Sequence, residues 1–204
     1  MEVTIDDSPA PDLVSAEAGE TFGQVFGRIM AGLRKQGRTV TAVQIDGRPL
    51  DEETADRVRE RPVGEIGRLA LTTADVSHVV GGLLSEIESS LTRLGLVAER
   101  VSRLFQSGDT KPALELTQEF IEAWQTLMEG IAQAARLGSR RLDEQRVGDE
   151  SATVRLKAVA DVLRELVGAF ERKDFVSVGD AFAYDLPEQI ESLREIVAGM
   201  NEGP

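Results

Sequence analysis

The side chains that most often do chemistry are scarce in this chain. It has one histidine, His78 in "DVSHVVGG", and no cysteine, which excludes disulfides, thiolate nucleophiles and zinc sites with sulfur ligands. A di-iron site in a helix bundle needs two Glu-x-x-His pairs, and no glutamate stands three residues before His78. A Ser-His-Asp triad would also have to use His78, and no G-x-S-x-G sequence accompanies it. We therefore expect no metal site, no catalytic residue, and an ordinary packed or exposed histidine.

Motifs for binding phosphate-containing cofactors are also missing. No G-x-x-x-x-G-K-[ST] or G-x-G-x-x-G sequence occurs, so no cofactor is expected. The glycines of "FGQVFGRIMAG" fall inside an amphipathic helical pattern, where they favour close packing over phosphate binding. Carboxylates that are far apart in sequence can still meet in a fold. An enzyme with a carboxylate pair at a junction between domains therefore stays open as an alternative to the main prediction, a protein that is not an enzyme.

The composition predicts an acidic protein with an aliphatic core. Hydrophobic residues make up 41% of the 204 positions and aromatic residues only 4%, which suits a helix bundle. The net charge of −13 repels phosphate backbones and predicts no nucleic-acid partner. The start, "MEVTIDDSPAPDL", lacks the features of a signal peptide, and no apolar run reaches the roughly 18 residues of a membrane span. We expect a cytoplasmic protein of a bacterium-like cell that does not contact membranes.

Residues 1–74 carry strand-like and helix-like patterns in alternation. Strands are expected at "EVTID", at the extended piece "DLVSAEA" (12–18), at "RTVTAVQI" before the turn Asp46-Gly47, and at "EIGRLALTT". A short helix is expected after Asp51. A longer amphipathic helix that ends at Gly37 has its apolar stripe at Phe22, Val25, Phe26, Ile29 and Leu33.

This order of elements, with the turn region "VQIDGRPLDEE", resembles the β-grasp or ubiquitin-like fold, in which a four-stranded mixed sheet wraps one helix. The resemblance covers residues 1–74 and implies a binding module, with a purely structural role as the alternative. The modifier and carrier roles of that family need a free carboxy-terminal diglycine. Here the domain runs into a helix and the chain ends in "NEGP", so we expect neither role.

Residues 75–204 are predicted to form an antiparallel four-helix bundle, built from hairpins at 75–138 and 149–201. The fold class expected for the whole chain is therefore α+β. Apolar residues at three-four spacing place the helices at about 75–107, 109–138, 151–172 and from 175 onward. Pro187 lies inside the fourth pattern, so a kink or break is expected near Asp185, which could cap a new helix.

The two hairpins match each other at an offset of 65 residues without a gap. We interpret this as two similar hairpins, in which a phenylalanine closes the first helix and an aspartate caps the second; chance similarity of amphipathic helices is the alternative. The corner at Asp109 then has a structural explanation and is not a site. The matched pairs are Leu91 and Leu156, Leu94 and Val159, Val97 and Val162, Val101 and Leu166, Phe105 and Phe170, Asp109 and Asp174, Ile121 and Leu186, Met128 and Leu193, and Ile131 and Ile196.

Three aromatic residues, Phe175, Phe182 and Tyr184, surround the fourth helix. They exceed what one core-facing stripe can hide, which indicates a partner-binding surface. The leading hypothesis is a non-catalytic cytoplasmic protein-interaction or scaffold module, which binds a protein partner or a second copy through an apolar helix face or groove.

A second hypothesis comes from the helical hairpins, whose turns, such as "FERKDFVSVGD", resemble those of flagellar-type export chaperones. The resemblance implies a chaperone that holds the helix of an export substrate. The two-part layout as a whole resembles uncharacterised bacterial proteins, a resemblance that implies no activity.

Overall fold

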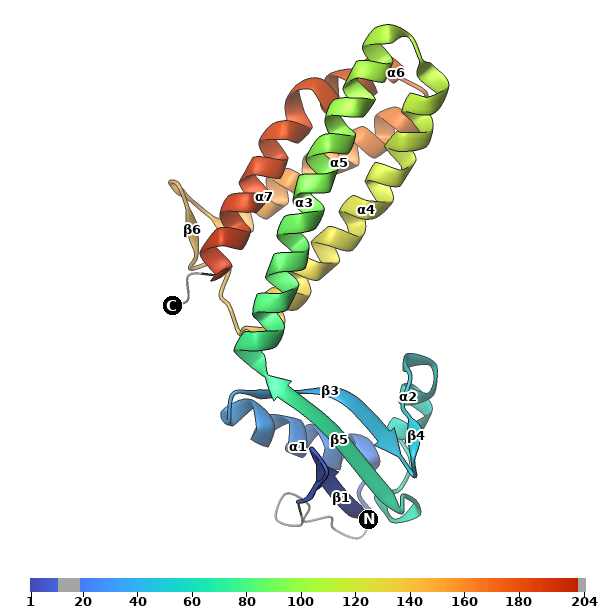
Figure 1. Cartoon of the computed structure of the whole chain (residues 1–204), viewed down its shortest axis with the longest axis vertical. Helices are drawn as coiled ribbons and strands as arrows, with labels where there is room; N and C mark the ends of the chain where they lie inside the picture. The colour runs from blue at the N-terminus through green and yellow to red at the C-terminus, as the bar shows by residue number, and fades with distance from the viewer. Residues whose placement is uncertain (11–18, 202–204) are drawn as a thin grey trace. The chain divides into compact units, whose positions relative to one another are not determined.

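The computed structural model describes residues 1–10 and 19–201 and divides into two compact units, Met1–Val79 and Val80–Pro204 (Figure 1). The first unit contains a mixed sheet with helices, and the second is largely helical. The fold class is therefore α+β, as predicted. No helix in the part of the chain that is described combines the length and apolarity that crossing a membrane requires.

The sheet of the first unit has five strands in the order β2-β1-β5-β3-β4, with β1 parallel to β5 and antiparallel pairing elsewhere. The predicted strand at 12–18 lies outside the described residues, and the strand that pairs with β1 is Ser8–Pro9, inside the segment predicted to be a turn. The elements are β1 (Glu2–Ile5), β2 (Ser8–Pro9), α1 (Phe22–Lys35), β3 (Arg38–Ile45), β4 (Arg48–Pro49), α2 (Glu52–Arg59), the 3-10 turn η2 (Val63–Glu65) and β5 (Arg68–Asp75).

The core of this unit lies between α1 and one face of the sheet. In β3 the register shifts between Val40 and Ala42, and this bulge changes which side chains point inward. Val40, Val43 and Ile45 therefore all pack against the core although their spacing is uneven. From the predicted stripe, α1 buries Phe22, Val25, Ile29 and Leu33.

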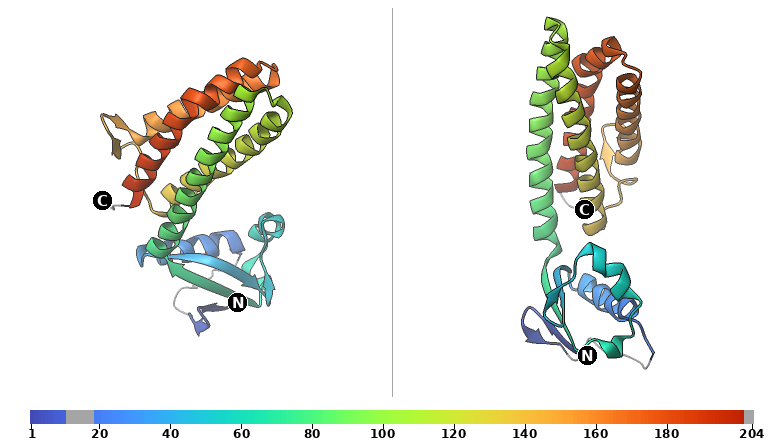
Figure 2. Two further views of the ribbon diagram at one scale, coloured as in Figure 1. Left: turned by 45° about the horizontal axis from the view of Figure 1, so that its top comes forward. Right: turned by 90° about the vertical axis from the view of Figure 1, so that its right-hand side faces the viewer.

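The second unit is an antiparallel bundle in which α3, α4, α5 and the run α6-η3-α7 take the places of the four predicted helices (Figures 1 and 2). The predicted linker contains a two-stranded ribbon, β6–β7, that the sequence pattern did not indicate. The elements are α3 (Val76–Ser107), α4 (Thr110–Leu137), β6 (Arg146–Val147), β7 (Glu150–Ser151), α5 (Ala152–Glu171), α6 (Phe175–Asp180), the π-helical turn η3 (Ala181–Asp185) and α7 (Leu186–Asn201).

The corners of the two hairpins have the same backbone conformation. Gly108 and Lys173 both adopt positive φ, 83° and 58°. Their N–H groups donate to the carbonyl oxygens of Phe105 and Phe170, at 3.1 and 3.0 Å. These positions are equivalent at an offset of 65 residues, so the similarity of the two hairpins is confirmed at their corners.

The aspartate predicted to cap the second helix of each hairpin does so only once. Oδ1 of Asp174 accepts a hydrogen bond from the N–H of Ser177 at 3.2 Å. Asp109 makes no such bond and instead accepts one from the Ser107 hydroxyl at 2.8 Å. The residue equivalent to Ser177 is Pro112, which has no N–H to donate. The prediction that Asp109 caps its helix is wrong for this reason.

Two aspartates tie the hairpins of the sheet to its central strand, β5. Asp6 and Asp46 open the β1–β2 and β3–β4 turns with φ of 48° and 51°. Oδ1 of Asp6 accepts from the N–H of Thr73, and Oδ1 of Asp46 from the N–H of Arg68, both at 2.8 Å. Each turn is thereby fixed to a different end of β5.

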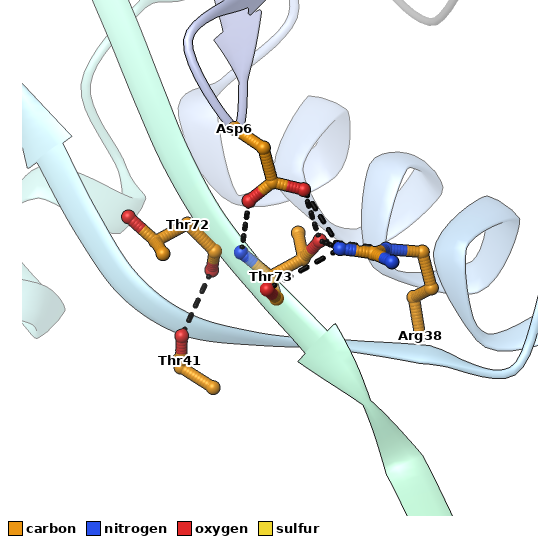
Figure 3. Close-up of polar contacts among 5 residues, drawn as sticks. All are labelled: Asp6, Arg38, Thr41, Thr72 and Thr73. Atoms are coloured by element: carbon orange, nitrogen blue, oxygen red, sulfur yellow. Dashed lines mark hydrogen bonds and ion pairs between the residues drawn. The ribbon is translucent and has the colours of Figure 1, made fainter.

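Asp6 has the larger set of partners. Its Oδ2 accepts hydrogen bonds from the Thr73 hydroxyl and from the Arg38 guanidinium, both at 2.7 Å (Figure 3). The bond from the Thr73 N–H, followed by that from its hydroxyl, holds the pKa of Asp6 below its ordinary value, and Arg38 acts in the same direction. The folded state therefore favours the ionised carboxylate.

Asp6→Asn tests this tie, because asparagine also tolerates positive φ but carries no charge. A folded-state pKa below the unfolded value stabilises the fold above pH of about 4, and this contribution is lost as the pH falls through the folded pKa. We expect the variant to have a lower Tm than wild type at pH 7, with the gap closing towards pH of about 3 in thermal melts followed by circular dichroism. Asp7→Asn, at the next position of the same turn, is the control. A gap that does not change with pH would contradict the role of the charge.

Candidate protein-binding site

Exposed apolar side chains gather along one pair of helices. Four large hydrophobic residues are exposed in the described part of the chain, and Leu96 on α3, Val176 on α6 and Tyr184 in η3 are three of them, at 62%, 75% and 74% exposure. The fourth, Val154, is 51% exposed and lies on α5. Apolar side chains that gather on one surface mark interaction sites, whereas single ones are ordinary.

Two hollows lie between α3 and the run α6-η3-α7, and we call them together the α3–α7 groove. The α3 and α7 ribbons that border it run next to each other in Figure 1. The first hollow, of about 330 Å³, is lined by Thr92, Gly95, Leu96, Ala98, Glu99, Pro187, Ile190, Glu191 and Arg194. The second, of about 380 Å³, is lined by Ser102, Phe105, Gln106, Thr110, Phe175, Val176, Gly179, Asp180, Ala183 and Tyr184.

The groove has the dimensions of a short helix. Its α3 wall runs from Thr92 to Gln106, which is about 21 Å or four turns at the α-helical rise. A glycine in each wall keeps the groove open. A Cβ added at Gly179 would lie 3.4 Å from that of Phe105, and one added at Gly95 would lie 4.0 Å from the guanidinium of Arg194.

The structure separates the three aromatics predicted to bind a partner. Phe175 and Tyr184 line the groove. Phe182 is only 1% exposed, and its ring packs edge-on against Phe120 of α4 with centroids 4.9 Å apart. Because its side of the helix faces the core, Phe182 contributes to packing and offers no surface to a partner.

Leu96 and Val176 line the groove but were not predicted from the sequence. Both lie off the three-four spacing that fills the core, on the side of their helices where polar residues are the rule. The only signal in the sequence was a large apolar residue outside the core stripe. Such a residue indicates a binding surface only when the fold brings several of them together from two helices.

A π turn interrupts the fourth helical run of the bundle. The N–H of Leu186 donates to the carbonyl oxygen of Ala181, five residues earlier, where an α-helix would use the fourth. Pro187, the next residue, has no N–H and cannot bond to the carbonyl of Ala183. The helix continues through this turn, so the prediction that Asp185 caps a new helix is wrong, while the predicted irregularity near it is present.

The π turn inserts one residue relative to the first hairpin. Before the turn, buried residues correspond at an offset of 65: Ala113 with Val178 and Thr117 with Phe182. After it they correspond at an offset of 66: Phe120 with Leu186, Trp124 with Ile190, Leu127 with Leu193, Ile131 with Val197, and Ala134 with Met200. Of the pairs predicted beyond the turn, Ile131 and Ile196 are both buried, but Ile121 and Met128 are half-buried and would pair with fully buried leucines, so the predicted match without a gap fails at these two.

The inserted residue explains why Tyr184 faces water. Phe182 and Leu186 are both buried, at 1% and 0% exposure, and three residues lie between them. In α4 the equivalent interval, from Thr117 to Phe120, holds only two. The wider π turn accommodates the extra residue on the outside of the bundle, and this places Tyr184 at the edge of the groove.

The lining of the groove is acidic. Asp180, Glu99 and Glu191 line it against a single base, Arg194. Arg194 Nη1 lies 3.1 Å from Glu191 Oε2, and Glu99 forms a looser pair with Arg103 at 3.8 Å. Asp180 makes no hydrogen bond or ion pair with the residues that the structure describes.

The aspartates with perturbed acidity have structural explanations. The pKa values of Asp51 and Asp174 are lowered chiefly by hydrogen bonds from the side chains of Thr54 and Ser177. That of Asp75 is lowered by bonds from the backbone at the start of α3, first at His78, whose side chain is exposed. A general acid needs a raised pKa instead. Among the side chains that the structure describes, no three of histidine, aspartate or glutamate gather to hold a metal ion.

Comparison with known proteins places this α+β chain in a family. The chain belongs to the family called Domain of unknown function (DUF8042), whose model matches residues 82–196, and residues 1–75 match the TP0873 N-terminal domain. A protein of Treponema pallidum (strain Nichols), named "Uncharacterized protein", is 25% identical over 210 residues, which cover 100% of this chain and 99% of the relative. The similarity therefore spans both units. No solved structure matches the chain.

Two substitutions separate the core role of Phe182 from the surface role of Tyr184. Phe182→Ala should lower the free energy of unfolding by about 3–5 kcal/mol, because it empties a buried site against Phe120. Tyr184→Ala should change it by less than about 1 kcal/mol. Urea denaturation followed by circular dichroism measures both. Similar losses of unfolding free energy in the two variants would contradict the assignment of Phe182 to the core and Tyr184 to the surface.

Deletion of Tyr184 tests the inserted residue directly. Removing one residue from an α-helix turns everything after it by about 100°, but here the deletion should convert the π turn into α-helix and keep the core in register. We expect it to lower the free energy of unfolding by no more than about 2 kcal/mol. The matched control is deletion of Glu119, an exposed residue in the equivalent interval of α4, where no residue is inserted; this deletion should prevent cooperative unfolding. Equal damage by the two deletions would show that no residue is inserted.

Proposed function

We propose that this chain is a non-catalytic, cytoplasmic protein-interaction module that holds a helix of a partner protein in the α3–α7 groove. The observation that carries the proposal is the exposure of Leu96, Val176 and Tyr184 along one groove of helical length. An amphipathic helix binds such grooves by placing apolar anchors at three-four spacing between two walls. The hollows near Gly95 and Gly179 would receive these anchors.

We propose that the first unit is a β-grasp domain with a supporting role. The support for this is a mixed sheet packed on one long helix, which the ubiquitin-like resemblance implies, although the sheet has five strands where four were expected. Both edge strands have two residues and contain a proline, Pro9 or Pro49, which hinders the addition of a partner strand. The sheet face that points away from α1 offers small or polar side chains: Ala42, Gln44, Ala70 and Thr72.

The two alternative functions have less support. An export chaperone could use the same groove, but neither matched family nor the Treponema protein is described as a chaperone. A carboxylate enzyme would need an acid with a raised pKa, and the shifts described above are all downward. The interaction module is therefore the function that we put to the test.

Photo-crosslinking in cells that naturally contain this protein tests the proposal. A benzoylphenylalanine at position 184 should yield a discrete adduct with one protein, whereas the same group at position 154, an exposed apolar site on α5, should not. Ala183→Trp, which fills the groove from its wall, should remove the adduct while leaving the thermal midpoint within a few degrees of wild type. Equal adducts from both positions, or an adduct that survives Ala183→Trp, would refute the groove as the binding site.

A further inference from the structure

We infer that the helix received by the α3–α7 groove is basic, an inference that rests on the proposed function. The wall formed by residues 174–201 contains six acidic residues and one basic residue, Arg194. The opposite wall, α3, contains three of each sign. The groove therefore lies beside a strongly acidic helical run, and the apolar rim residues sit within that negative field.

Asp180 places one of these negative charges inside the groove. It lines the second hollow with Val176 and Tyr184, two of the exposed apolar residues. Arg164 and Arg172 line a neighbouring hollow together with Asp180, but no described residue forms an ion pair with its carboxylate, so a lysine or arginine on the bound helix can pair with it directly. Glu191 is already paired with Arg194, so Asp180 is the better anchor for a basic partner.

The same charges argue against a second copy of this chain as the occupant. Each copy carries a net charge of −13, and residues 174–201, with six acidic residues and one basic residue, already form one wall of the groove. Two copies would bring like charges together, which opposes association and costs more at low ionic strength. A basic amphipathic helix from a different protein satisfies both the apolar rim and the charge.

Binding of three stapled 16-residue helices to the full chain tests the inference. The peptides share one leucine face and carry lysine, glutamate or glutamine on the polar face, so that only charge differs. Fluorescence anisotropy should show the lysine peptide binding at least about tenfold more tightly than the glutamate peptide at low salt. This preference should shrink as sodium chloride rises to about 0.5 M, because screening acts on the charged contacts.

Variants assign the preference to the groove. Asp180→Lys should weaken binding of the lysine peptide roughly fivefold to tenfold and leave binding of the glutamine peptide unchanged. Glu129→Gln, an exposed acid of α4 outside the groove, should affect neither. Equal binding of the three peptides, each lost in Ala183→Trp, would overturn the basic partner but leave the proposed function intact. Binding of none of them, together with no crosslink at position 184, would overturn both.

Discussion

The contact between Phe120 and Phe182 constrains the geometry of the second unit. Both rings are buried, and their centroids lie 4.9 Å apart across two helices. One turn later Leu186 is also fully buried. Protein interiors are packed about as densely as organic crystals, so neither side chain can move aside without opening a cavity. The extra residue between Phe182 and Leu186 must therefore point out of the core, and the π turn is the backbone conformation that allows this.

This constraint connects core packing to the surface. Full burial of a large apolar side chain contributes about 1.5–3 kcal/mol of favourable free energy. Leu96, Val176 and Tyr184 are exposed in the isolated chain and do not make this full contribution. A partner that covers them can recover the contribution without any rearrangement of the core. The groove is consequently a fixed feature of the bundle, because residues buried on both sides of the π turn hold its walls in place.

Sequence reasoning predicted the elements whose patterns are local. The α1 stripe from Phe22 to Leu33, the limits of α3 and the corners near Asp109 and Asp174 follow from spacing, caps and glycine. The failures were of a different kind. A strand of two residues at Ser8–Pro9 has too few side chains to show a period, and it forms because the turn that begins at Asp6 is tied to Thr73 of β5, 67 residues away.

The candidate site was predicted only in part, for a related reason. Phe175, Phe182 and Tyr184 were selected together because they are close in sequence. The π turn sends Phe182 into the core and Tyr184 to the surface, although only two positions separate them. A single inserted residue is difficult to detect, since a shift of one position leaves most apolar residues facing roughly the same side of a helix.

The places where the two hairpins differ meet on one surface. Pro112 deprives Asp109 of a capping partner at the start of α4, two residues after Thr110, which lines the second hollow. The inserted residue lies in η3, whose Ala183 and Tyr184 line the same hollow from the other side. Local rules of helix formation are expected to be broken where function requires it. Elsewhere the two hairpins keep equivalent corners and equivalent buried positions, so the departures from similarity point to the groove independently of the exposure of its rim.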